Sequence, residues 1–266
     1  MRKIQYADIA QDAVKVFTKK EDVASFPLTL LPLENSAKNT GGTGVLIANV
    51  RQVSIRVVDV LQKPVTDKWG KWQQRIGKKD PITCWDLVKS AFPFGEKMNE
   101  ETHVFDGCIY ENKAGAMRFF MTAIPVCIAE EMAGAGVQLF GGACRLRYMD
   151  TAENILFRYY ARQEADVFWI IFPQGEGLRV LLLTDGLPKA AWYVSCHQQF
   201  REDEMLRCLH AFDGRRSFPE YEKSTTAQKQ GVVLNTDLDL DWLYTLLATQ
   251  GIAAAKEEYN LRKFIQ

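Results

Sequence analysis

The segment from Val167 to Ser195, VFWIIFPQGEGLRVLLLTDGLPKAAWYVS, decides the fold class. It contains three apolar runs, at 167–172, 178–184 and 190–194, which are separated by two clusters of Gly, Pro and charged residues. Short apolar runs bounded by such clusters are typical of strands, and Asp185-Gly186 between two of them indicates a hairpin. The first two runs are continuously apolar, which predicts a sheet covered on both faces. The segment therefore predicts a three-strand antiparallel meander at the centre of a two-faced sheet.

The composition indicates a globular protein without an overall electrostatic preference. Of the 266 residues 47% are hydrophobic and 25% are charged, and 33 basic residues balance 33 acidic ones. A chain without net charge has no field that attracts nucleic acid or an anionic membrane, so we expect neither as a partner. The N-terminal residues lack the apolar region of a signal peptide, and no uncharged apolar window approaches the ~18 residues of a membrane span. No two of the six cysteines have Cys-x-x-Cys spacing. This scattered distribution favours reduced thiols in a cytoplasmic protein.

The remainder of the chain mixes strand-like and helix-like patterns. Strands are predicted over 4–17 (two strands around a turn), 23–34, 45–60 (two strands), 102–110, 117–125, 137–140, 232–234 and 252–259. Helices are predicted over 65–77, 80–91, 127–133, 151–162, 199–212 and 240–250. Gly134-Ala135-Gly136 should stop the third helix, and Thr151 should cap the fourth, with Glu153 in its first turn. No internal repeat occurs at a fixed period, and the strands arrive in hairpins with helices between them, so the class is mixed α/β.

The sequence contains no recognisable catalytic or metal-binding motif. The cluster Gly41-Gly42-Thr43-Gly44 lacks the Lys and the following helix of a phosphate-binding P-loop, so it is interpreted as a plain loop. Cys196-His197, Cys208 and His210 form the only Cys/His cluster, and their spacing does not give tetrahedral ligand geometry. We therefore expect no metal ion and no catalytic residue.

Six phrases along the chain occur in the order that is found in one protein family. They are DIAQDAVKV at 8–16, FPLTLLPLEN at 26–35, WDL to AFPF at 85–94 with the strand 103–110, the segment 117–136, the hairpin 167–194 and the segment 232–252. Together they resemble the actin-like ATPases of bacterial surface-appendage machines, above all the PilM family of type IV pilus assembly and the cytoplasmic domain of the GspL family of type II secretion. The resemblance implies an actin-like, ribonuclease H-like two-lobed fold with an inserted α+β subdomain. Its parts would be 1–51 as the first part of the N-terminal lobe, 52–136 as the insert, 137–165 as the return to the N-terminal lobe, and 166–266 as the C-terminal lobe.

The resembled family holds nucleotide phosphates at two hairpin turns. Each turn needs an Asp to organise Mg²⁺ and water, and a Gly so that the backbone can approach the phosphates. Here the first turn keeps Asp8 but has Ala10 in place of the Gly, and the second, Phe172-Pro173-Gln174-Gly175, has no Asp. Pro173 also lacks a backbone donor, and Asn235-Thr236-Asp237 stands where the family has a Gly-Gly against adenosine. We therefore expect no ATP hydrolysis and neither ATP nor Mg²⁺ as a cofactor, with Asp8 as the one remaining cofactor-binding candidate.

Three functional hypotheses follow, and the first is favoured. It is a nucleotide-independent actin-like scaffold of a type IV pilus or type II secretion-like machine, cytoplasmic and brought to the inner face of the membrane by a partner. In the resembled family a groove between the first subdomain and the insert takes an extended cytoplasmic peptide of a membrane-anchored protein. The candidate anchors here are Trp69, Trp72, Phe92 and Phe94, unless they pack into the insert's own core. The second hypothesis is a divergent actin-like ATPase or sugar-kinase-like phosphotransferase using Asp8. The third is a globular protein with a partner that the sequence does not identify, and a homo-oligomer is compatible with all three.

Overall fold

The structure is a computed structural model of the chain. It describes residues 4–10, 13–20, 22–27, 43–60, 65–66, 72–76, 80–83, 101–140, 145–163, 165–196, 201–210, 229–235 and 239–265. The chain forms two compact units, a larger one of Met1–Arg51 with Met132–Gln266 and a smaller one of Gln52–Glu131.

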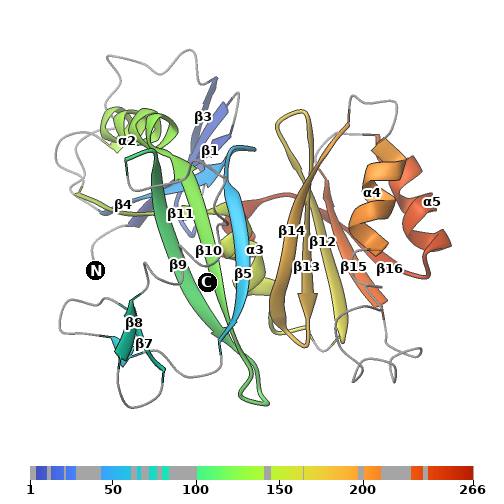
Figure 1. Ribbon diagram of the computed structural model, residues 1–266. Coiled ribbons are helices and arrows are strands. Elements are labelled where there is room, and N and C mark those ends of the chain that lie inside the picture. Colours follow the sequence, from blue (N-terminus) through green and yellow to red (C-terminus); the bar gives the residue numbers. More distant parts are fainter. Residues whose placement is uncertain are drawn as a thin grey trace. The chain divides into compact units, whose positions relative to one another are not determined.

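The larger unit contains two five-stranded sheets with the same strand order (Figure 1). The first sheet has the order β11-β4-β1-β2-β3 and consists of β1 (Ile4–Ala10), β2 (Ala13–Phe17), β3 (Asp22–Pro27), β4 (Thr43–Asn49) and β11 (Arg145–Thr151). The second has the order β14-β13-β12-β15-β16 and consists of β12 (Val167–Gln174), β13 (Gly177–Thr184), β14 (Leu187–Ser195), β15 (Lys229–Asn235) and β16 (Ala253–Glu258). In each sheet three antiparallel strands come first; a parallel strand is then added beside the first strand, and a second parallel strand is added beside that one. The repeat therefore lies in the topology, although no periodicity in the sequence reveals it.

The meander β12-β13-β14 is confirmed as the centre of the second sheet. Every residue of β13 is buried, as is every residue of β12 except the partly buried Pro173. Asp185 and Gly186 at the second hairpin have φ values of 54° and 73°, the left-handed conformations that a two-residue type I′ turn requires. β14 forms an outer edge and is only half-buried, so the covering on both faces applies to the two inner strands.

Two helices pack on the second sheet and bury apolar side chains of its strands. α4 (Arg201–His210) and α5 (Asp241–Thr249) lie side by side in Figure 1. The core under them combines side chains of the sheet with side chains of both helices, among them Trp169, Val180, Leu182, Met205, Leu209, Leu243 and Leu247. α3 (Ala152–Tyr160) contacts the short α6 (Leu261–Phe264), which the sequence pattern does not predict because one turn has no periodicity.

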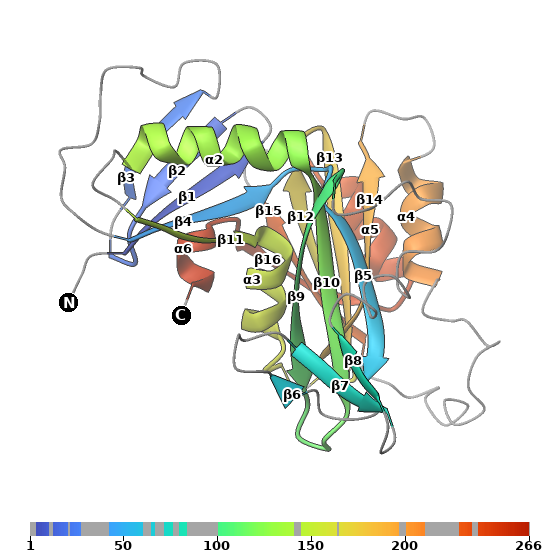
Figure 2. The same ribbon diagram turned by 60° about the vertical axis from the view of Figure 1, so that its left-hand side comes forward.

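α2 is one continuous helix, Val126–Phe140, so the predicted break at Gly134–Gly136 and the predicted strand over 137–140 are wrong (Figure 2). A Cβ atom on Gly136 would lie 2.8 Å from Leu46 Cδ2 of β4, and one on Gly44 would lie 2.5 Å from the Phe140 ring. Gly136 and Gly44 therefore allow α2 to approach the first sheet closely and do not end the helix. The strand β11 was not predicted from its Arg-rich sequence.

The smaller unit contains two three-stranded antiparallel sheets. β5 (Ser54–Val60), β9 (His103–Glu111) and β10 (Met117–Pro125) form the order β5-β10-β9, with Phe119 and Met121 fully buried. β6 (Val65–Thr66), β7 (Trp72–Ile76) and β8 (Asp80–Thr83) form the other sheet. The predicted helix over 65–77 is therefore wrong, as is the predicted helix start at Asp80, because strand pairing prevails over a weak helical spacing. Residues 84–91 lie outside the described residues.

No helix within the described ranges has both the length and the apolar character that crossing a bilayer requires.

Candidate functional site

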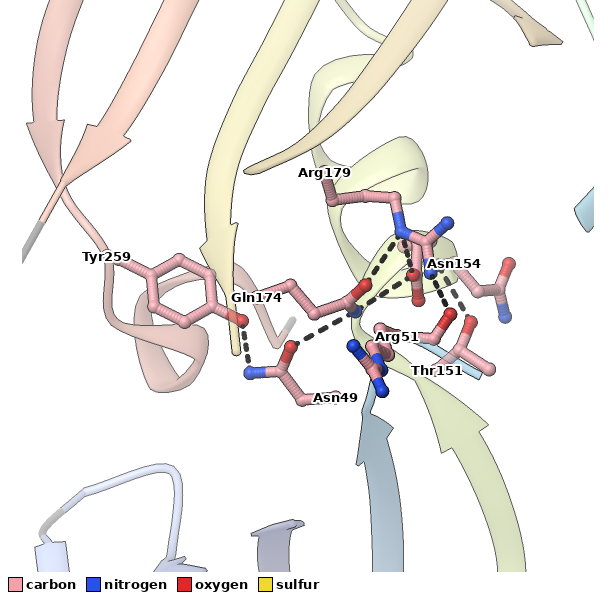
Figure 3. A network of polar contacts seen from close by, with 8 residues as sticks. Asn49, Arg51, Thr151, Asn154, Gln174, Arg179 and Tyr259 are labelled. Atoms are coloured by element: carbon pink, nitrogen blue, oxygen red, sulfur yellow. Dashed lines mark hydrogen bonds and ion pairs between the residues drawn. The ribbon is translucent and has the colours of Figure 1, made fainter. Parts of the chain in front are cut away.

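Five buried polar side chains of the larger unit form a connected network, which we call the polar bridge (Figure 3). Asn49 ends β4 and Glu153 lies in the first turn of α3, so both belong to the first sheet and its helices. Gln174 ends β12, Arg179 lies in β13 and Tyr259 follows β16. None of the five is more than 9% exposed, so the network is shielded from solvent.

An ion pair forms the charged part of the polar bridge. Arg179 Nε lies 2.9 Å from Glu153 Oε1, and both side chains are at most 5% exposed. Thr151 fixes the start of α3, because its hydroxyl accepts a hydrogen bond of 3.2 Å from the Asn154 N–H, as predicted. The Arg179 guanidinium also donates to the Arg51 carbonyl at 3.3 Å. A buried carboxylate needs such a partner, because removing one member of a buried pair costs about 3–5 kcal/mol.

Gln174 connects the charged part of the polar bridge to its neutral part. Its Nε2 donates to Asn49 Oδ1 at 3.3 Å and to Glu153 Oε1 at 3.1 Å, and its Oε1 accepts from Arg179 Nε at 2.8 Å. Asn49 Nδ2 in turn donates to Tyr259 Oη at 2.9 Å. One amide side chain from the second sheet therefore hydrogen-bonds Asn49 of the first sheet and Glu153 of α3.

The hairpin geometry places Gln174 at this point. Gln174 pairs with Gly177, so the turn consists of Gly175 and Glu176 and is shorter than the predicted break over 173–177. Gly175 has a φ of 57°, and Gly at the first central position suits a type II′ turn. Pro173 pairs with Leu178 as a strand residue.

Asp8 of β1 lies next to the polar bridge. It is 6% exposed, and its strand neighbours are Lys15 of β2 and Ile47 of β4. Burial raises its pKa to about 7, while Lys15 and a hydrogen bond from Asn49 act to lower that pKa. Its Oδ1 atom has no hydrogen-bond partner among the described residues. Asp8 therefore carries a proton for a large fraction of the time near neutral pH.

Tyr259 is affected by the same charges. Burial raises the pKa of its phenol well above the usual range, and the carboxyl groups of Asp8 and Glu153 raise that pKa further. Its ring stacks on Phe172 with centroids 5.5 Å apart and planes within 9° of parallel. The phenol consequently stays neutral and serves as a hydrogen-bond partner of Asn49.

The structure places only part of the candidate residues that the sequence suggests. Asp8 lies beside the polar bridge, as described above. Trp69, Phe92 and Phe94 lie outside the described residues, and of Trp72 only the backbone, in β7, is described. The four aromatic residues therefore stay a prediction. Asp237 also lies outside the described residues.

Sequence reasoning missed the ion pair, although a signal for it was present. Arg179 interrupts the apolar run LRVLLLT, in a strand predicted to be buried on both faces. A charge at such a position requires a buried partner, so a carboxylate elsewhere had to face it. Glu153 was instead interpreted through the helix dipole alone. Asn49 and Gln174, as polar residues at strand ends, gave no signal.

Most polar groups of the site bind one another. Arg179 neutralises Glu153, and Gln174 uses both its donor and its acceptor within the network. Asp8 is the remaining group with proton-transfer capacity near neutral pH. Nowhere in the described part of the chain do three His, Cys, Asp or Glu side chains gather where they could hold a metal ion.

Known proteins resemble this chain in structure. No protein-family model matches the sequence, and no curated protein matches it. A chain of the PilM–PilN type IV pilus biogenesis complex is similar over 99% of this chain and 90% of its own length, with a TM-score of 0.54 and 15% identity. A Bacteroides thetaiotaomicron VPI-5482 protein of unknown function, with an actin-like ATPase fold, is similar over 96% of this chain and 91% of its own length, with a TM-score of 0.49 and 10% identity.

The similarity to the chain of the PilM–PilN complex shows the fold. The chain has a mixed α/β fold with two sheets of the same strand order, and the predicted actin-like fold and resemblance to PilM are confirmed at the level of the fold.

Proposed function

We propose that this protein is a nucleotide-independent, actin-like scaffold of a type IV pilus or type II secretion-like assembly machine, and that it binds the cytoplasmic tail of a membrane-anchored partner. The polar bridge is the observation that carries this proposal. In the resembled family, nucleotide lies between the two halves of the fold, with its phosphates at two hairpin turns. Here Gln174 and Arg179 of the second hairpin contact Asn49 and Glu153 directly.

The electrostatics beside the polar bridge support independence from nucleotide. An Asp that organises Mg²⁺ must be ionised, but burial raises the pKa of Asp8 to about 7. The carboxylate of Glu153 is neutralised by Arg179, and this pair would have to separate before Glu153 could face a metal ion. Both carboxyl groups are therefore poorly prepared for a Mg²⁺–phosphate ligand.

The fold supports the scaffold part of the proposal. The similar structure is a complex named for type IV pilus biogenesis, and the similarity extends over almost the whole of this chain. Capture of an extended peptide requires a groove and apolar anchors but no catalytic residue. Trp69, Trp72, Phe92 and Phe94 are the proposed anchors.

The experiment measures binding of a synthetic peptide with the sequence of a cytoplasmic tail. The tail is taken from a single-pass membrane protein encoded beside this protein, and its binding is followed by fluorescence anisotropy. We expect the tail to bind, and we expect Trp69→Ala and Trp72→Ala, made singly, to weaken binding by about tenfold or more, because a buried aromatic anchor contributes ~2 kcal/mol. Trp242→Ala, on α5 of the larger unit, is the matched control and should bind like the parent.

Melting temperatures of the same variants separate docking from packing. Normal melting with lost binding supports the proposed anchors. If stability and binding fall together in both variants, the tryptophans belong to the core of the smaller unit and the proposed anchors are wrong. If the parent protein does not bind the tail, the scaffold proposal is contradicted.

A further inference from the structure

Two sets of contacts of different chemistry join the two sheets of the larger unit. The first is the polar bridge, which consists of hydrogen bonds and one ion pair. The second, which we call the aromatic contact, consists of Tyr159 and Tyr160 of α3, Phe264 of α6 and Phe168 of β12. Its ring centroids lie 4.9 to 5.8 Å apart. A further hydrogen bond of 3.0 Å runs from Tyr160 Oη to Glu257 Oε2 of β16.

The chemistry of these contacts determines which of them can open. Water can replace the hydrogen bonds of the polar bridge, and it hydrates Glu153 and Arg179 once they separate, so opening there costs less free energy than opening an apolar contact. Opening the aromatic contact would expose large apolar surfaces, for which water offers no compensation. Any relative movement of the two sheets should therefore begin at the polar bridge and leave the aromatic contact intact.

We propose that the polar bridge is a latch that holds the two sheets closed without a ligand, and that the aromatic contact is its pivot. Glu153 and Asn49 supply the first sheet's half of the latch, and Gln174 and Arg179 supply the other half. Directional bonds specify a single closed position, because Gln174 satisfies its three partners only when both sheet ends are in place. The latch is a property of the protein alone and does not depend on the proposed partner.

Hydrogen exchange measured by mass spectrometry tests the latch, first in the unmodified protein without nucleotide. Apart from the exposed residues Arg51, Gly175 and Glu176, segments 49–53 and 172–179 should exchange slowly, although faster than 181–183 in the middle of β13, because the closed bridge shields them but opens first. Exchange in the unmodified protein as fast at the buried residues of 49–53 and 172–179 as at these exposed ones would contradict the proposal, whatever any variant does.

The double variant Glu153→Gln/Arg179→Met removes both charges of the pair together, so neither partner is left as an unpaired ion. We expect segments 49–53 and 172–179 to exchange about tenfold faster in it, while 181–183 and the pivot segment 155–160 keep their protection. The control Glu258→Gln/Lys263→Met makes corresponding changes in an exposed ion pair and should leave 49–53 and 172–179 unchanged.

Gln174→Ala keeps the ion pair and decides the question if the double variant does not fold. It should accelerate exchange in the same two segments by a smaller factor. Acceleration of exchange in 181–183 and 155–160 to the same extent would show that the bridge is ordinary core. Unchanged exchange at 49–53 and 172–179 in both variants would show that the bridge does not hold the sheets together.

Discussion

At the scale of single residues, buried ionisable groups distinguish the site from its surroundings. Arg179 pairs with Glu153 through Oε1, whereas Glu153 Oε2 and Asp8 Oδ1 have no hydrogen-bond partner among the described residues. Desolvation is the largest influence on Asp8, and it raises the pKa from 3.8 to about 7. The folded state therefore holds a proton that the unfolded chain releases at a lower pH.

This pKa shift predicts a pH-dependent effect of Asp8→Asn. Between pH 4 and 7 the folded protein binds this proton more tightly than the unfolded chain, so stability falls as pH rises, by about 1.4 kcal/mol per pH unit. Asn resembles protonated Asp and carries no such dependence. The melting temperature of the variant relative to the parent should therefore rise from pH 5 to pH 8. Asp203→Asn, on the exposed face of α4, is the control. A constant difference across this range would contradict the assigned pKa.

At the scale of elements, the sequence predicted strands better than it predicted breaks. The meander over 167–195 and the hairpin at 4–17 are confirmed because apolar runs and turn residues agree there. The predicted break in α2 was wrong because glycine does not only end helices. It also allows two elements to pack closely against each other. That use of Gly136 depends on Leu46, some ninety positions earlier in the chain, and no local pattern contains it.

The two glycines of α2 provide a matched pair of substitutions. Gly134→Ala should stabilise the protein by about 0.5–1 kcal/mol, because alanine is the better helix former and the added Cβ meets no atom within 4 Å. Gly136→Ala should destabilise it by about 1 kcal/mol or more, since the added Cβ comes within 2.8 Å of the fully buried Leu46. Chemical denaturation measures both. Equal effects of the two substitutions would contradict the close approach of α2 to β4.

The site illustrates the same limit of sequence reasoning. Asp8 was identified through a family resemblance, and Arg179 could have been recognised as a lone charge in an apolar strand. The contact of Gln174 with Asn49 could not be predicted, because it depends on two strand ends that lie 125 positions apart. Amide side chains at strand ends are common, and only tertiary structure shows which of them face each other.

At the scale of the whole molecule, the repeated topology of the larger unit shows which positions of the two hairpins correspond. Ala10 ends β1 and Gln174 ends β12, so the two residues hold corresponding positions in the two sheets. The first position carries a small residue, and the second carries the long amide that hydrogen-bonds Asn49 and Glu153. In a nucleotide-binding relative, the corresponding turns would hold phosphates.

The effect of Mg²⁺ and ATP on the melting temperature tests the central claim most directly. A ligand at a hundred times its dissociation constant stabilises a protein by about 2.7 kcal/mol, which raises the melting temperature of a chain of this size by several degrees. We predict that millimolar ATP with Mg²⁺ leaves the melting temperature where Mg²⁺ alone leaves it. A clear increase with ATP that disappears in Asp8→Ala would contradict independence from nucleotide.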